Sequence, residues 1–139
     1  MFERKSLGLA EAQQAVQAML EEASKGGRPM SVAVVDAWGN PISLARMDGA
    51  SPLTVRMALN KAYTAASFGG DTRNLNTWFK QAGKDIAWYD DHRLTVVHGG
   101  VCVRLKDGTL VGAIGASGRH EDEDEALSLV GKKALEAVL

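Results

Sequence analysis

The sequence has a single cysteine, Cys102, among its 139 residues, so no disulfide can form within the chain. It has no apolar run near the roughly 20 residues that a membrane-spanning helix needs, and its first residues, MFERKSLGLAEAQQ, lack the apolar core of a secretory signal. Neither charge sign is in excess, because 16 basic residues stand against 17 acidic ones. We therefore expect a cytoplasmic protein that neither spans a membrane nor binds nucleic acid.

The composition is that of an ordinary globular chain. Apolar residues make up 45% and charged residues 24% of the sequence, which argues against disorder. The length suits one hydrophobic core but not two good ones. We expect a single domain over residues 1–139.

The order of sequence patterns predicts an α+β fold. Apolar residues at helical spacing predict an amphipathic helix over Leu9–Ala23. Ser51-Pro52 is a typical helix start, and Lys106-Asp107-Gly108 is a typical tight turn between strands. The other predicted helices are Leu53–Phe68, Asp71–Phe79 and Glu121–Leu139, and the predicted strands are Ser31–Val35, Pro41–Met47, Leu94–Val97, Val101–Leu105 and Thr109–Ile114. Neighbouring strands that pair as hairpins favour a mainly antiparallel sheet of about five strands, with helices packed on it.

Several segments together resemble the GlcG/HbpS-type family, also described as heme-degrading or PduO C-terminal-like. These are VAVVDAWGNPISLARMDGA, NKAYTAASFG, HGGV and LVGAIGASGRHEDEDEAL, in this order and spacing. The resemblance implies a profilin-like fold, assembly into homo-oligomers, and binding of heme or a related tetrapyrrole. It also implies, as an alternative, a non-catalytic accessory protein of glycolate or diol metabolism.

The segment His98-Gly99-Gly100 is the first candidate site. Two glycines let a ligand approach the backbone, and an imidazole can bind a metal, such as heme iron, or move protons. A histidine that merely ends a strand is the equally weighted alternative. Many family members have proline where this chain has His98, and the stretch Lys84–Arg93 also departs from the family pattern.

Two cationic residues of the family segments are further candidates. Arg46 could clamp a carboxylate such as a heme propionate, or could pair with Asp48 or Asp36 to hold its loop. Lys61, in an otherwise apolar helix, either reaches the surface or lies in a pocket that favours its neutral form. If the protein is an enzyme, His98 would be the acid/base and Arg46 the carboxylate clamp, with Lys61 assisting, in an isomerase or lyase type of reaction.

Other chemistry-bearing residues carry weaker expectations. The segment Gly112–Gly118 is expected to be a loop whose small residues allow close packing, with anion binding as the lesser alternative. His120 and Asp124, four residues apart on a helix, form a minor metal-site hypothesis.

The aromatic residues and the cysteine are expected to be structural. Trp78, Trp88 and Tyr89 could wall a macrocycle but more readily complete a core or a subunit contact. Cys102 is expected to be a buried, inert thiol. An iron-ligating imidazole must be His92, His98 or His120, because the first 91 residues contain no histidine.

Overall fold

The computed structural model describes residues 1–139. Its elements are α1 (Leu9–Ala23), β1 (Ser31–Asp36), β2 (Pro41–Arg46), α2 (Pro52–Phe68), α3 (Thr72–Ala82), the short 3₁₀ helix η1 (Ile86–Tyr89), β3 (Gly100–Arg104), β4 (Leu110–Ser117) and α4 (Glu121–Glu136). The α+β class is therefore confirmed. None of the helices is long and apolar enough to be a candidate for crossing a membrane.

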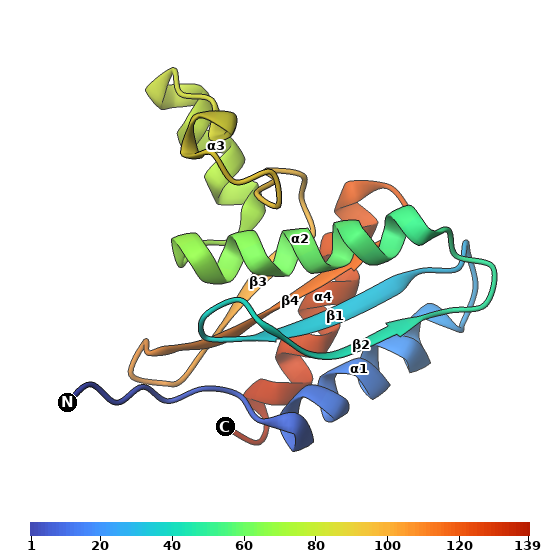
Figure 1. Cartoon of the computed structure of the whole chain (residues 1–139). Helices are drawn as coiled ribbons and strands as arrows, with labels where there is room; N and C mark the ends of the chain where they lie inside the picture. Colours follow the sequence, from blue (N-terminus) through green and yellow to red (C-terminus); the bar gives the residue numbers. More distant parts are fainter.

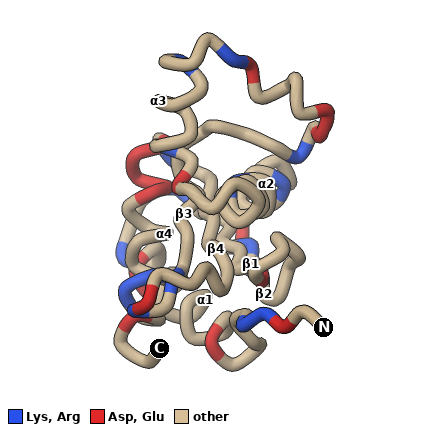
Figure 2. The backbone as a smooth tube through the Cα atoms, turned by 90° about the vertical axis from the view of Figure 1, so that its left-hand side faces the viewer, with Lys and Arg blue, Asp and Glu red and all other residues tan.

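The four strands form one antiparallel sheet in the order β2-β1-β4-β3. Helix α2 covers one face of this sheet, and α1 and α4 cover the other (Figure 1). The larger apolar core lies between the sheet and the α1–α4 pair, and a smaller core of mostly alanine and valine lies under α2. Basic and acidic residues are interspersed along the backbone (Figure 2).

Local sequence explains where α2 begins and ends. Pro52 occupies the first turn, where the N–H that proline lacks has no intrahelical partner. Gly69 follows the helix in the left-handed region, at φ 68°, and its N–H bonds to the carbonyl of Ala65. A residue with a Cβ would be strained in this conformation.

Helix α2 lies very close to the sheet because the facing strands carry glycine. A Cβ at Gly115 of β4 would overlap the carbonyl oxygen of Ala58, and one at Gly100 of β3 would overlap the carbonyl oxygen of Lys61. Tight packing as the role of the small residues is thus confirmed. The segment Gly112–Gly118 is not the expected loop, however, because β4 continues through Ser117, which pairs with Ser31 of β1.

The segment Thr72–Arg93, comprising α3, η1 and the following turn, extends away from the three layers; we call it the arm (Figure 1). Its base is a cluster of edge-to-face rings formed by Phe68, Phe79 and Tyr89, at centroid distances of 5.2–5.7 Å. Trp88 of η1 has an exposed fraction of 69%. The arm is therefore anchored by aromatic contacts and leaves a large aromatic surface open.

The prediction of a fifth strand at Leu94–Val97 is wrong. The residues are rich in β-branched side chains, but they follow the arm as irregular chain. The N–H of Thr95 donates to the Thr64 hydroxyl of α2 at 2.9 Å, so it bonds to a helix side chain and not to a neighbouring strand.

Candidate functional site

Lys61 of α2 forms a buried ion pair with Asp124 of α4. Its ammonium lies 2.9 Å from Asp124 Oδ2 and 3.0 Å from the carbonyl oxygen of Ala116, and the two side chains are only 1% and 3% exposed. The other carboxylate oxygen accepts the N–H of Arg119 at 3.0 Å. Burial raises the pKa of Asp124, although the hydrogen bond from Lys61 and the charge of Lys61 oppose the shift. Lys61 therefore neither reaches the surface nor faces an open pocket.

The glycine pair, Gly99 and Gly100, packs against Lys61. Gly99 has φ 132°, and a Cβ there would come within 2.9 Å of Lys61 Cδ. Its carbonyl accepts the Ser128 hydroxyl at 2.6 Å, and the N–H of Gly100 donates to the Thr72 hydroxyl at 3.0 Å. The Gly99 carbonyl and the Gly100 N–H are thus both used within the fold.

His98 lies between α3 and α4. Its Nε2 is 3.4 Å from the Asn76 amide nitrogen, and its Nδ1 is 3.5 Å from Asp122 Oδ1. Its backbone N–H donates to Glu121 Oε2 at 3.0 Å. Both ring nitrogens therefore face protein groups, and the surroundings of the ring carry acidic side chains.

The structure does not bring Arg46 to this place. Arg46 ends β2 at one edge of the sheet, whereas Gly100 begins β3 at the opposite edge, with β1 and β4 between them. Arg46 is exposed and takes part in none of the salt bridges, and Asp36 instead accepts the N–H groups of Trp38 and Asn40. The sequence candidates for one acid/base site are therefore divided between two places.

His120 and Asp124 also face different surroundings. The Asp124 carboxylate is turned into the core toward Lys61, while the His120 ring is exposed and accepts the N–H of Asp122. No group of three or more potential metal-ligating side chains occurs in the structure. A metal ion at Asp124 would have to displace the Lys61 ammonium.

Cys102 is buried in β3. Its thiol donates to the carbonyl oxygen of Ala65 at 3.3 Å, and its N–H donates to Asp71 Oδ1 at 2.8 Å. Burial raises the pKa of Cys102 to about 11. This agrees with the expected inert thiol.

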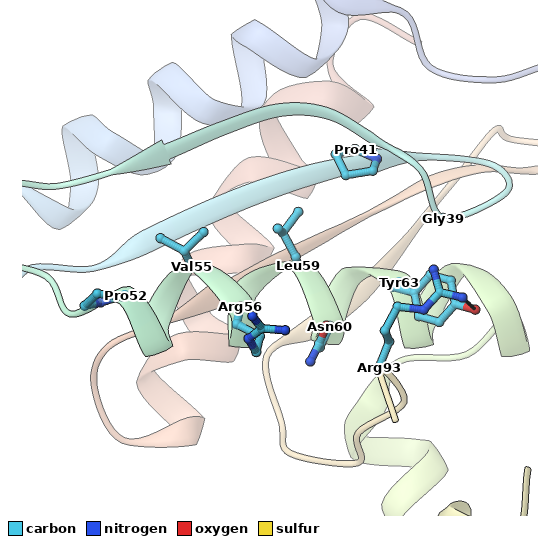
Figure 3. A pocket seen from close by; sticks show the side chains of 9 residues that line it. All are labelled: Gly39, Pro41, Pro52, Val55, Arg56, Leu59, Asn60, Tyr63 and Arg93. Carbon is cyan, nitrogen blue, oxygen red and sulfur yellow. Dashed lines mark hydrogen bonds between the residues drawn. The ribbon is translucent and has the colours of Figure 1, made fainter. Parts of the chain in front are cut away.

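An open cavity of about 350 Å³ lies along α2, beside the β1–β2 hairpin; we call it the α2 cavity. Val55 and Leu59 rise from α2 toward Pro41, while Arg56 and Asn60 lie along the other side of the helix (Figure 3). The remaining lining residues are Gly39, Pro52, Tyr63 and Arg93. This cavity was not predicted from the sequence, although the spacing of Arg56, Asn60 and Tyr63 places all three on one stripe of a helix.

Tyr63 and the end of the arm close one end of the α2 cavity. The Arg93 guanidinium lies 4.1 Å from the Tyr63 ring centroid and donates to the Tyr63 hydroxyl at 2.8 Å. The same hydroxyl donates to Asp91 Oδ2, and this hydrogen bond raises the pKa of Tyr63. Bonds from Arg93 and Tyr63 hold the pKa of Asp91 well below its usual range. On the other side, a Cβ at Gly39 would come within 2.8 Å of the Tyr63 ring, so glycine lets the hairpin turn lie against it.

A second cavity, of about 360 Å³, lies on the arm and includes His92; we call it the arm cavity. Ile86, Ala87 and Leu94 give it an apolar wall, and Asp90 and Asp91 complete the lining. His92 is exposed, and its ring makes no hydrogen bond or salt bridge in the structure. Among the three histidines, it is the one whose imidazole has both nitrogens free.

Comparison with known proteins places the chain in a family. A family model described as haem-degrading protein HbpS-like matches residues 7–132. Protein GlcG of Escherichia coli strain K12 is 34% identical over 97 residues, which is 70% of each chain. Among solved structures, a double mutant of Streptomyces reticuli HbpS has a TM-score of 0.87 and 35% identity, covering 97% of this chain and 90% of the other. The PduOC:heme complex has a TM-score of 0.82 and 26% identity, covering 93% and 94%. This chain therefore belongs to the HbpS-like family.

Proposed function

We propose that this protein binds heme, or a related tetrapyrrole, at the arm cavity with His92 as the iron ligand. The observation that carries the ligand class is the correspondence, over more than nine tenths of both chains, with a relative whose structure is a heme complex. The expectation from the sequence segments points to the same class of ligand.

The residues of the arm fit the needs of a heme. Heme iron is commonly held by a histidine, and the ring needs apolar surface. The His92 imidazole has no hydrogen bond that iron binding would break, and it lies beside the apolar wall of Ile86, Ala87 and Leu94. Trp88, which follows Ala87 in η1, adds an exposed flat apolar side chain to the same segment. A bound heme would supply a redox-active iron, while this chain's residues would hold the macrocycle and shield part of it from water.

His92 fits this role better than His98. Coordination through Nε2 of His98 would require the ring to leave Asn76, and coordination through Nδ1 would require it to leave Asp122. The proposal therefore assigns the iron to His92 and keeps His98 as the residue to test against it.

The test is a visible absorption titration of the full chain with hemin. We expect a saturable shift of the Soret band in the wild type and in His98→Ala, and a lost or weakened shift in His92→Ala. His120→Ala is the matched control, because this exposed imidazole lies at the start of α4. A shift that disappears in His98→Ala and persists in His92→Ala would overturn the assignment to the arm. No saturable shift in the wild type would overturn the proposed function itself.

A further inference from the structure

We propose that the α2 cavity is a separate binding site for a small monocarboxylate, with the carboxylate held by Arg56 and Asn60 and the apolar body lying against Val55 and Leu59. The site shares no lining residue with the arm cavity, so it does not depend on the heme proposal. Its volume of about 350 Å³ is at the small end of the roughly 300–1,000 Å³ of ordinary ligand pockets.

The polar side of the cavity has donors without partners. The Arg56 guanidinium forms none of the salt bridges or hydrogen bonds of the structure, and neither does the side-chain amide of Asn60. The two residues are one helical turn apart, so their donors lie along the same stripe of α2 (Figure 3). A guanidinium and an amide N–H together match the two oxygens of a carboxylate.

The charge of the cavity favours a single negative charge. No acidic residue is in its lining, which contains two guanidinium groups, those of Arg56 and Arg93. Arg93 is already paired with Asp91, at 3.0 Å. One cation, Arg56, therefore remains to be neutralised, which suits a monocarboxylate better than a dicarboxylate or a phosphate.

The opposite side of the cavity is apolar and set by the fold. Val55 and Leu59 are each partly buried and face Pro41 of the hairpin (Figure 3). The contact of Gly39 with the Tyr63 ring, and the stacking of Arg93 on the same ring, fix the closed end. A ligand with a short aliphatic or aromatic body would remove Val55 and Leu59 from water while its carboxylate meets Arg56.

The test is an NMR titration of the ¹⁵N-labelled full chain with acetate, butyrate and benzoate, and with benzamide as the neutral counterpart of benzoate. We expect saturable shifts of the Arg56 Nε–Hε and Asn60 side-chain amide signals with at least one carboxylate, and none with benzamide. Arg56→Gln, a change at an exposed helix position, should raise the dissociation constant at least tenfold. Arg46→Gln is the matched control, because Arg46 is another unpaired, exposed guanidinium but lies outside the cavity lining, and it should leave binding unchanged.

Three results would overturn the proposal: no saturable shift with any of the carboxylates, equal shifts with benzoate and benzamide, or equal loss of binding in the Arg46 and Arg56 variants. None of them would affect the hemin titration, which reports on the arm. Failure of this site and failure of the heme proposal are therefore distinguishable.

Discussion

Replacing Lys61 with methionine measures how strongly the fold depends on the buried ion pair. Methionine keeps most of the side-chain length but removes the charge, which leaves the 3%-exposed Asp124 carboxylate with Arg119 N–H as its remaining donor. Removing one partner of a buried pair costs about 3–5 kcal/mol, because the other charge stays buried without compensation. With a urea slope of about 2 kcal/mol per molar, the unfolding midpoint should fall by about 2 M, measured by circular dichroism.

The pH dependence of this variant has a definite sign. Burial raises the pKa of Asp124, and the variant loses the hydrogen bond and the charge of Lys61, which oppose this shift. A carboxyl whose pKa is raised by folding favours the folded state below its unfolded pKa and disfavours it as pH rises through the folded pKa. The loss of stability in Lys61→Met should therefore be smaller near pH 4 than near pH 8.

Two further variants separate buried charge from other effects of the substitution. The double variant Lys61→Met/Asp124→Leu should recover most of the lost stability, because no charge is left buried. Lys25→Met is the matched control: Lys25 lies 2.8 Å from Glu22, but both side chains are exposed, so the midpoint should not change measurably. A large cost of the unpaired buried charge is refuted if Lys61→Met unfolds within about 0.5 M of the wild type, or if the double variant is no more stable than the single one.

Three other substitutions or conditions test separate parts of the structure. Gly115→Ala would place a Cβ on the carbonyl of Ala58 and should lower the free energy of unfolding by about 1–3 kcal/mol in a urea titration. Cys102, with its pKa near 11, should react with a thiol reagent at pH 8 only after denaturant is added. The carboxylate of Asp91 has a lowered pKa, so the stability that it contributes is fully present above its unfolded pKa near 3.9 and is lost progressively as pH falls from there toward its folded pKa. The difference in urea midpoint between the wild type and Asp91→Asn should therefore shrink from pH 7 to pH 3.

Each of these has a contrary outcome. An unchanged midpoint in Gly115→Ala would mean that α2 does not lie against β4 as described. Rapid labelling of the native thiol would mean that β3 opens readily at Cys102. A pH-independent effect of Asp91→Asn would mean that its charge has no part in holding the arm.

Most of the fold could be predicted because its elements have local causes. The spacing of apolar residues in Leu9–Ala23 gave both ends of α1, and the turn Lys106-Asp107-Gly108 correctly joins two paired strands. The prediction of a strand at Leu94–Val97 was wrong because β-branched residues favour extended backbone but do not decide whether a segment pairs with a strand of the sheet. In the structure, the Thr95 N–H of this segment donates to the Thr64 hydroxyl of α2 instead of to a strand.

The candidate sites were less predictable because they depend on contacts between distant parts of the chain. Lys61 and Asp124 were both named from the sequence, yet only the fold shows that they bind each other. The α2 cavity combines Gly39 from the hairpin with Arg93 from the arm, and no local pattern joins the two. The helical spacing of Arg56, Asn60 and Tyr63 was the one signal available in the sequence.

The most direct test of heme binding at the arm is to locate the iron. The ¹⁵N-labelled full chain would be loaded with hemin, and, as a diamagnetic reference, with gallium protoporphyrin. If His92 binds the iron, the paramagnetic iron should broaden the backbone signals of Ala87–Arg93 most strongly. Broadening centred on His98–Gly100, with the arm unaffected, would contradict heme binding at the arm.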